Sequence, residues 1–168
     1  FKDGGKTFDP TGVNFIMNPY DEWYALVRAL ELKEEKGGSV TVVHCGPVAN
    51  DVTIRKALAI GADDAVRIDM VPGSANAVAT EIAAHARDAG YDLIMTGKET
   101  IDYNGALTGG MIAALLDLPF ISHASHLVYN GDTATVTRDI EGGDEEIEIS
   151  GPFVVSASKG MAEQRIPN

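Results

Sequence analysis

The chain has 168 residues, a hydrophobic fraction of 45% and a formal charge of −12 from 13 basic and 25 acidic residues. This length favours a single domain over residues 1–168, and the apolar fraction is typical of a globular protein with a buried core. An acidic surface repels phosphate backbones and anionic headgroups, so the composition argues against nucleic-acid and membrane-surface binding.

The cysteine count and the hydropathy of the sequence indicate the cellular compartment in which the protein is expected. Cys45 is the only cysteine, so an internal disulfide is excluded, and we expect a reducing, cytoplasmic compartment of the bacterial type. No apolar run approaches the roughly 18 residues of a membrane span, and the first residues lack a signal-peptide pattern. We therefore expect no membrane insertion.

The first two thirds of the chain alternates expected helices and short strands after an irregular lead-in over residues 1–17. Asn18 is a suitable N-cap and Pro19 a suitable first helical residue for a helix that ends before Gly37-Gly38. Further helices are expected at 51–60, 75–88 and 106–116, and strands at 39–44, 65–68 and 92–96. This alternation predicts an α/β fold, Rossmann-like, with a parallel sheet covered by helices on both faces.

The last third has a different pattern. Asn130-Gly131 is a strong hairpin signal between expected strands at 125–129 and 133–140. A second turn leads into 146–149, which alternates acidic and apolar residues, and 153–156 is expected to be a buried strand. The sequence therefore predicts an antiparallel C-terminal hairpin region attached to the parallel sheet.

Three segments are expected at the carboxyl ends of the parallel strands, where open α/β sheets bind ligands. They are Asn18, the strand end at His44 and Cys45, and the polar loop that begins at Gly97. That loop leads to a helix start near Thr108, where free N–H groups suit a phosphate. No Walker or G-x-G-x-x-G motif accompanies it.

Plainer readings of these residues stay open. Gly97 and Gly105 could be ordinary turn residues, and Cys45 could be a small core hydrophobe. His123 and His126 are three apart in an expected extended stretch and would face opposite sides. No metal site and no catalytic residues are predicted, so we expect a binding or carrier protein rather than an enzyme.

Several segments in order resemble the electron transfer flavoprotein β subunit family, and together they cover essentially the whole chain. They are Met17-Asn18-Pro19, Cys45-Gly46-Pro47, the run 53–63, Asp92-Leu93-Ile94 followed by Gly97-Lys98, Ile101-Asp102 with Thr108-Gly109, and the run 137–143. Relative to that family, the first strand and the C-terminal tail are absent from the sequence.

The resemblance implies a heterodimer that accepts electrons from dehydrogenases, such as acyl-CoA dehydrogenases, and passes them on. FAD would be held together with an α subunit, and this chain would hold AMP or a second FAD. The positions that the resemblance assigns to the nucleotide are Asn18, His44, Cys45, Gly97, Asp102, Asn104, Gly105, Ala106, Leu107 and Thr108.

The resemblance also implies partner-docking residues. Asp139 matches a carboxylate near the flavin-domain hinge, where it would pair with an arginine of the α subunit. The segment 159–168 matches the recognition loop for dehydrogenases, with Met161 as an apolar anchor and Arg165 beside it.

One departure leaves the ligand open. Tyr103, Ala106 and Leu107 cannot supply the carboxylate and amide contacts of the family's loop, although backbone N–H groups could still hold phosphate. AMP and a second FAD are therefore both possible from the sequence. A stand-alone adenine-nucleotide-binding sensor is the alternative function, and an adenylating enzyme is disfavoured because a pyrophosphate-gripping glycine motif is absent.

Overall fold

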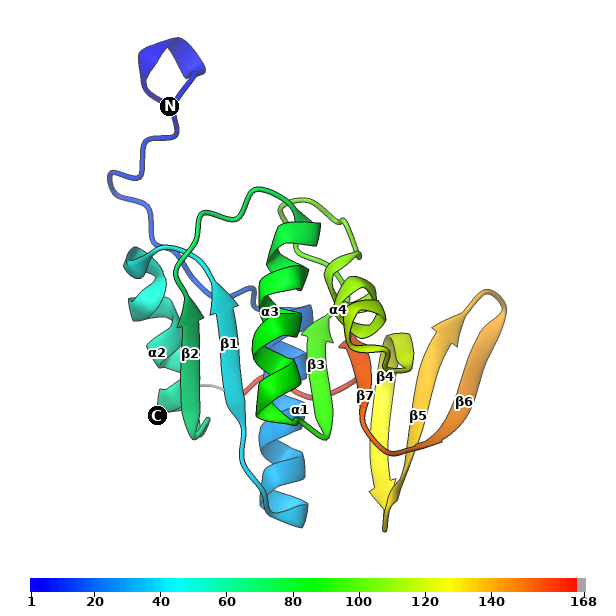
Figure 1. Ribbon diagram of the computed structural model, residues 1–168. Helices are drawn as coiled ribbons and strands as arrows, with labels where there is room; N and C mark the ends of the chain where they lie inside the picture. The colour runs from blue at the N-terminus through cyan, green and yellow to red at the C-terminus, as the bar shows by residue number, and fades with distance from the viewer. Residues whose placement is uncertain (166–168) are drawn as a thin grey trace.

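The computed structural model describes residues 1–165, and its element order is that of an α/β protein (Figure 1). The helices are α1 (Asp21–Lys36), α2 (Asp51–Ala59), α3 (Ala75–Ala89) and α4 (Thr108–Leu116). The strands are β1 (Thr41–Cys45), β2 (Asp64–Ile68), β3 (Leu93–Gly97), β4 (Phe120–Asn130), β5 (Thr133–Ile140), β6 (Gly143–Ser150) and β7 (Phe153–Ala157). Two short 3-10 turns, Asp3–Gly5 and Val48–Asn50, complete the order.

The strands form two sheets rather than one. β1 and β2 pair in parallel, and a five-stranded sheet has the order β3-β7-β4-β5-β6. Within it β3, β7 and β4 are parallel, whereas β4, β5 and β6 are antiparallel. The predicted α/β class and antiparallel end are confirmed. The prediction of one parallel sheet is wrong, because among residues 1–165 no ladder joins β1 to β3.

Helices cover both faces of the sheets, and strand β7 shows this through its two-residue period. Phe153 and Val155 pack in one cluster with Ala25 and Leu32 of α1. Val154, between them, packs in another cluster with residues of α3 and α4. All five residues of β7 are buried, as expected of a central strand with a helix on each side.

Helix α1 holds the two sheets together. Its Leu26 and Leu30 pack with Val42 of β1 and with α2, while Ala25 and Leu32 pack against the five-stranded sheet. A single helix therefore buries different stripes against two separate sheets, and its packing replaces the missing ladder.

The start of α1 lies later than predicted. The helix begins at Asp21, and its N-cap is Tyr20 rather than Asn18. The Asn18 side chain instead makes an Asx-type turn, in which Oδ1 accepts from the N–H of Tyr20 at 3.2 Å. The acidic first turn of Asp21 and Glu22 still faces the positive end of the helix dipole, as expected.

Helix α4 also begins later than predicted, at Thr108 instead of 106. Ala106 has φ 51°, a left-handed conformation that cannot belong to an α-helix. The helix then approaches the sheet closely, since a Cβ on Gly109 would lie 2.7 Å from Thr96 Oγ1. A glycine is required there for α4 to reach the end of β3.

Strand β4 is longer than the predicted 125–129 because it pairs differently along its length. Phe120 and Ile121 pair in parallel with β7, and the residues from His126 onward pair antiparallel with β5. Both ladders shift register between these parts, which is the mark of a bulge. His123 lies in the bulge with φ 57°, a conformation that the alternation of a regular strand could not predict.

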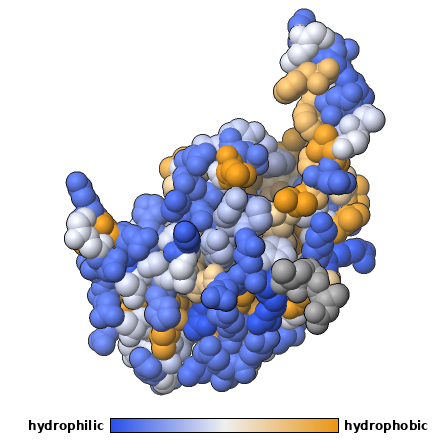
Figure 2. Space-filling model, turned by 180° about the vertical axis from the view of Figure 1, so that it is seen from behind, coloured by the Kyte–Doolittle hydropathy of each residue, from blue (hydrophilic) through white to orange (hydrophobic). Residues whose placement is uncertain are grey.

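The lead-in over residues 1–17 projects beyond the carboxyl ends of β1 and β2 (Figures 1 and 2). Phe1, Phe8 and Phe15 make successive edge-to-face contacts and are 88%, 52% and 61% exposed. In the described part of the chain, no helix is long and apolar enough to span a bilayer.

The packing of α1 gives a matched test of stability. Val27 on α1 is 1% exposed and Val52 on α2 is 72% exposed. We expect Val27→Ala to lower the free energy of unfolding by about 2 kcal/mol, because two buried carbons are lost and a small cavity remains. Val52→Ala should change it by less than about 0.5 kcal/mol. Urea unfolding of both variants measures the difference, and equal losses would contradict the assignment of the core.

Candidate functional site

A pocket of about 490 Å³ lies where the carboxyl end of β3 meets the start of α1. Both its volume and its place at a sheet edge are typical of small-molecule sites. The residues that line it are Asn18, Tyr20, Asp21, Tyr24, Lys98, Glu99, Ile101, Asn104 and Lys159. Three segments distant in sequence therefore contribute: the turn before α1, the loop after β3 and the residues after β7.

Gly97 brings the first two segments together. A Cβ on Gly97 would lie 2.7 Å from the backbone nitrogen of Glu22 and 2.9 Å from its side chain. Any other residue would push β3 and α1 apart. Gly97 is therefore required for packing, and the packing that it allows also shapes the pocket.

Glu22 is a half-buried carboxylate at the edge of this pocket. Burial raises the pKa of Glu22, while its hydrogen bond from Asn18 Nδ2 opposes the shift. Asp21 and Asp102 also raise this pKa, which places the predicted Asp102 in the same acidic neighbourhood. Carboxylates and amides at a strand end are suited to ribose hydroxyls and amino groups rather than to phosphate.

Two lysines also line the pocket. Lys98 Nζ lies 3.0 Å from Glu99 Oε1, and the hydrogen bond to Lys98 lowers the pKa of Glu99. Lys159, just after β7, is the second cation in the lining. The pocket thus combines carboxylates and ammonium groups, and Asp21 lies close enough to Lys98 to raise the pKa of that lysine. A ligand with both hydroxyl and phosphate groups offers partners to both kinds of charge.

The loop 98–107 is exposed and partly left-handed. Asn104 has φ 49° and Ala106 has φ 51°. A Cβ on Gly105 would meet no atom within 4 Å. The left-handed conformation occurs at its neighbours Asn104 and Ala106 and not at the glycine. Asn104 tolerates this region better than most residues, and its side chain reaches the pocket.

The start of α4 offers free backbone donors beside this loop. Its N-cap residue Leu107 makes no capping hydrogen bond within the described structure, so the first N–H groups, from Thr108 onward, are available. Thr96 Oγ1 is buried next to this turn and has no hydrogen-bond partner among residues 1–165. An anion at this helix start would satisfy donors that the protein leaves unpaired.

His44 and Cys45 do not line the pocket. His44 Nε2 lies 2.8 Å from Asn50 Nδ2, and burial lowers the pKa of this histidine. Cys45 is 6% exposed with its sulfur 3.9 Å from the carbonyl of Val78, and burial raises the pKa of the thiol. These contacts match the plain reading of Cys45 as a core residue.

Of the ten predicted nucleotide residues, the pocket brings Asn18 and Asn104 together and places Asp102 nearby. Gly97 shapes it from behind, and the remaining loop positions lead away toward α4. Sequence reasoning missed the charged residues Asp21, Lys98, Glu99 and Lys159, which line the pocket. The sequence signal that could have found them is their position next to the ends of predicted strands and helices.

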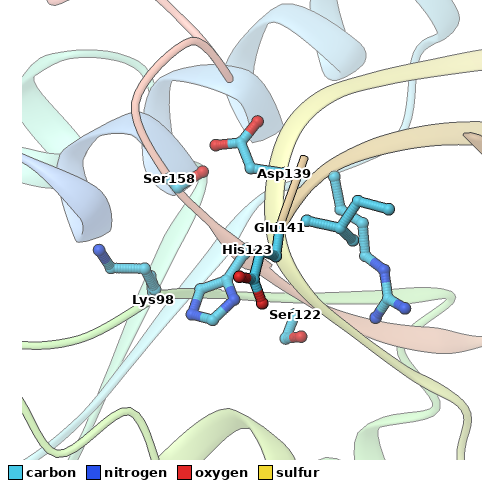
Figure 3. A pocket seen from close by; sticks show the side chains of 8 residues that line it. Lys98, Ser122, His123, Asp139, Glu141 and Ser158 are labelled. Carbon is cyan, nitrogen blue, oxygen red and sulfur yellow. The ribbon is translucent and has the colours of Figure 1, made fainter. Parts of the chain in front are cut away.

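A second pocket, of about 540 Å³, lies between the ends of β3 and β7 and the β5–β6 hairpin (Figure 3). Its lining is Lys98, Ser122, His123, Arg138, Asp139, Ile140, Glu141 and Ser158. Arg138 is held by Glu145 at 2.6 Å. Asp139 lies opposite Asp144 in the β5–β6 ladder, and like charges in such a pair are unfavourable.

The C-terminal segment is folded onto the body. Met161 is 3% exposed and packs in the cluster of α1, β4 and β7, so an anchor role would require it to leave this position. Arg165 binds Glu34 through both terminal nitrogens, at 2.7 and 2.9 Å. The predicted recognition loop therefore begins as a strap along α1. Residues 166–168 lie outside the described part.

Groups of three or more histidine, cysteine, aspartate or glutamate side chains that could hold a metal ion do not occur among residues 1–165. The polar pocket lies at the carboxyl ends of parallel strands, which is where open α/β sheets commonly bind ligands.

The family is shown by comparison with known proteins. The family model described as the electron transfer flavoprotein domain matches residues 6–167. The chain belongs to the electron transfer flavoprotein domain family.

Relatives with this domain come from bacteria and animals. The chain is 36% identical over 161 residues to the electron transfer flavoprotein subunit beta of Bacillus subtilis, covering 94% of the chain and 62% of that protein. It is 40% identical over 165 residues to protein FixA of Azotobacter vinelandii, covering 92% and 58%. The human electron transfer flavoprotein subunit beta is 38% identical over 166 residues, covering 94% and 65%. The chain thus spans about three fifths of the length of these relatives.

The buried carboxylate Glu22 predicts a dependence of stability on pH. Because its folded-state pKa is raised above 4.5, its neutral form favours folding, and this contribution is lost as pH rises through the folded-state pKa. We expect Glu22→Gln, which mimics the neutral form, to unfold at higher urea than the unchanged chain at pH 7. The difference should shrink toward pH 4. A variant less stable at pH 7 would contradict the burial argument.

Proposed function

We propose that this chain is the nucleotide-holding part of an electron transfer flavoprotein β subunit. It pairs with an α subunit, accepts electrons from a dehydrogenase through FAD held with that subunit, and passes them on. The proposal also includes a reducing cytoplasmic compartment. Its support is the family match over residues 6–167 together with a polar pocket at the carboxyl edge.

The residues present fit an adenine nucleotide. Asn18, Asp21 and Asn104 supply amide and carboxylate groups for ribose and base, and Tyr24 adds an aromatic wall. Lys98 and Lys159 supply the positive charge that phosphate requires. AMP is the smaller ligand that has a base, a ribose and a phosphate, and a second FAD is the larger alternative for the same position.

The chain's own residues bind and orient rather than react. FAD, when bound with the α subunit, supplies the electron-accepting chemistry. The carboxylate, amide and ammonium groups of the pocket bind the nucleotide, and the hairpin with Asp139 presents a carboxylate to the α subunit. The single observation that supports this division is the juxtaposition of Asn18, Lys98 and Asn104 in one pocket.

Assembly is the first test. Co-expression with an α subunit of this family should give a yellow complex of one α chain and one β chain that releases AMP or a second FAD on denaturation. Mass spectrometry of the released nucleotides identifies which. A colourless monomer would contradict the proposal, and tight ATP binding by the chain alone would support a stand-alone sensor instead.

Asn104 tests the nucleotide pocket. Asn104→Gly keeps a backbone that accepts φ 49° and removes only the amide, so AMP should bind about three- to tenfold more weakly, as expected for one lost hydrogen bond. Calorimetry on the complex measures the affinity. Asn14→Gly, in the exposed lead-in, is the matched control and should bind AMP unchanged. Equal affinities for both variants would place the nucleotide elsewhere.

Asp139 tests the partner contact. Asp139→Ala should slow electron delivery by about tenfold, through loss of one charge-assisted contact to the α subunit, while the heterodimer still forms. Stability should not fall, because Asp139 faces Asp144 across the ladder. Stopped-flow reduction of the complex measures the rate, with Asp132→Ala in the hairpin turn as control. Loss of the heterodimer would make Asp139 an assembly residue instead.

A further inference from the structure

Lys98 lies between the two pockets and lines both. It borders the pocket of Asn18 and Asn104, and it also borders the pocket of His123 and Asp139 (Figure 3). Among the residues described as lining them, it is the only one that the two pockets share.

The backbone of Lys98 is fixed while its side chain is loosely held. Its N–H donates to the carbonyl of Ala157 at 2.8 Å, at the end of the β3–β7 ladder. Its side chain is 30% exposed, and its ion pair is with Glu99 at 3.0 Å. A surface pair of this kind contributes little free energy, so the ammonium can exchange partners at small cost.

Carboxylates from both pockets act on this ammonium. The hydrogen bond to Glu99 raises the pKa of Lys98 most, and Asp21 on the first side and Asp139 on the second side raise it further. One flexible cation therefore balances acidic groups in two neighbouring sites.

We propose that Lys98 couples the two pockets: an anion in the pocket of Asn18 draws its ammonium away from the pocket of Asp139. This inference rests on the proposed nucleotide site. A phosphate competes with Glu99 for the ammonium, because both accept charge-assisted hydrogen bonds from it. Once Lys98 has moved, Asp139 and Glu141 lose compensating positive charge, and the second pocket becomes a better site for a cationic side chain of a partner protein. By linkage, a cation bound there strengthens anion binding in the first pocket by the same factor.

The test uses AMP and adenosine as probes, with backbone amide NMR shifts and affinities as readouts. In the unchanged chain, AMP should shift amides around Asn18 and also those of Ser122, His123 and Glu141, while adenosine should shift only the first group. In Lys98→Met the second set of shifts should vanish and AMP affinity should fall about tenfold, and Lys98→Arg should restore both. Lys159→Met is the matched control, because Lys159 lines only the first pocket, and its second set of shifts should persist.

The outcomes separate the two proposals. AMP shifts around Asn18 without any at His123 would overturn the coupling and leave the nucleotide site standing. Second-pocket shifts that persist in Lys98→Met, or that adenosine also produces, would likewise overturn it. Absence of any AMP-dependent shift would overturn the nucleotide site and the coupling with it.

Discussion

The close approach of β3 to the first turn of α1 is the constraint on which the rest of the site depends. With only a hydrogen in place of a side chain at Gly97, the end of the strand touches the backbone of Glu22. This contact sets the turn at Asn18 beside the loop after β3 and withdraws the Glu22 carboxylate from water. The pocket between these segments and the raised pKa of Glu22 both depend on this close approach.

The charges at the site differ from the net charge of the chain. An acidic chain with a formal charge of −12 still gathers Lys98 and Lys159 at the ends of β3 and β7. Local geometry rather than overall charge therefore decides what this edge of the sheet can bind. The net charge acts at longer range, where it repels other anionic surfaces.

The sequence predicted most of the elements because their signals are local. Apolar periodicity located the helices, and the Asn130-Gly131 turn located the β4–β5 hairpin, which the structure confirms. The errors have both local and long-range causes. The left-handed Ala106 moves the start of α4, the bulge at His123 lengthens β4, and the side chain of Asn18 makes a turn instead of a cap.

Only some of the residues predicted for the nucleotide line the pocket. Asn18 and Asn104 both line a pocket at the carboxyl edge where the sequence predicts the site. Cys45 was predicted as a site residue from its place at a strand end, but its thiol packs inward against α3. The sequence placed Lys98 in the loop after a predicted strand but did not place Lys159 beside it, because these lysines follow β3 and β7, whose pairing only the folded sheet reveals.

The division into two sheets has a consequence for the behaviour of the chain in solution. β1 and β3 run under the same helices, and among residues 1–165 each has one edge whose N–H and C=O groups lack a strand partner. Such edges are templates for any extended backbone, including one from a neighbouring molecule. Repulsion between acidic molecules opposes that association, and salt weakens the repulsion over distances beyond about 10 Å at 0.1 M. A higher ionic strength therefore weakens the repulsion that opposes backbone pairing at these edges.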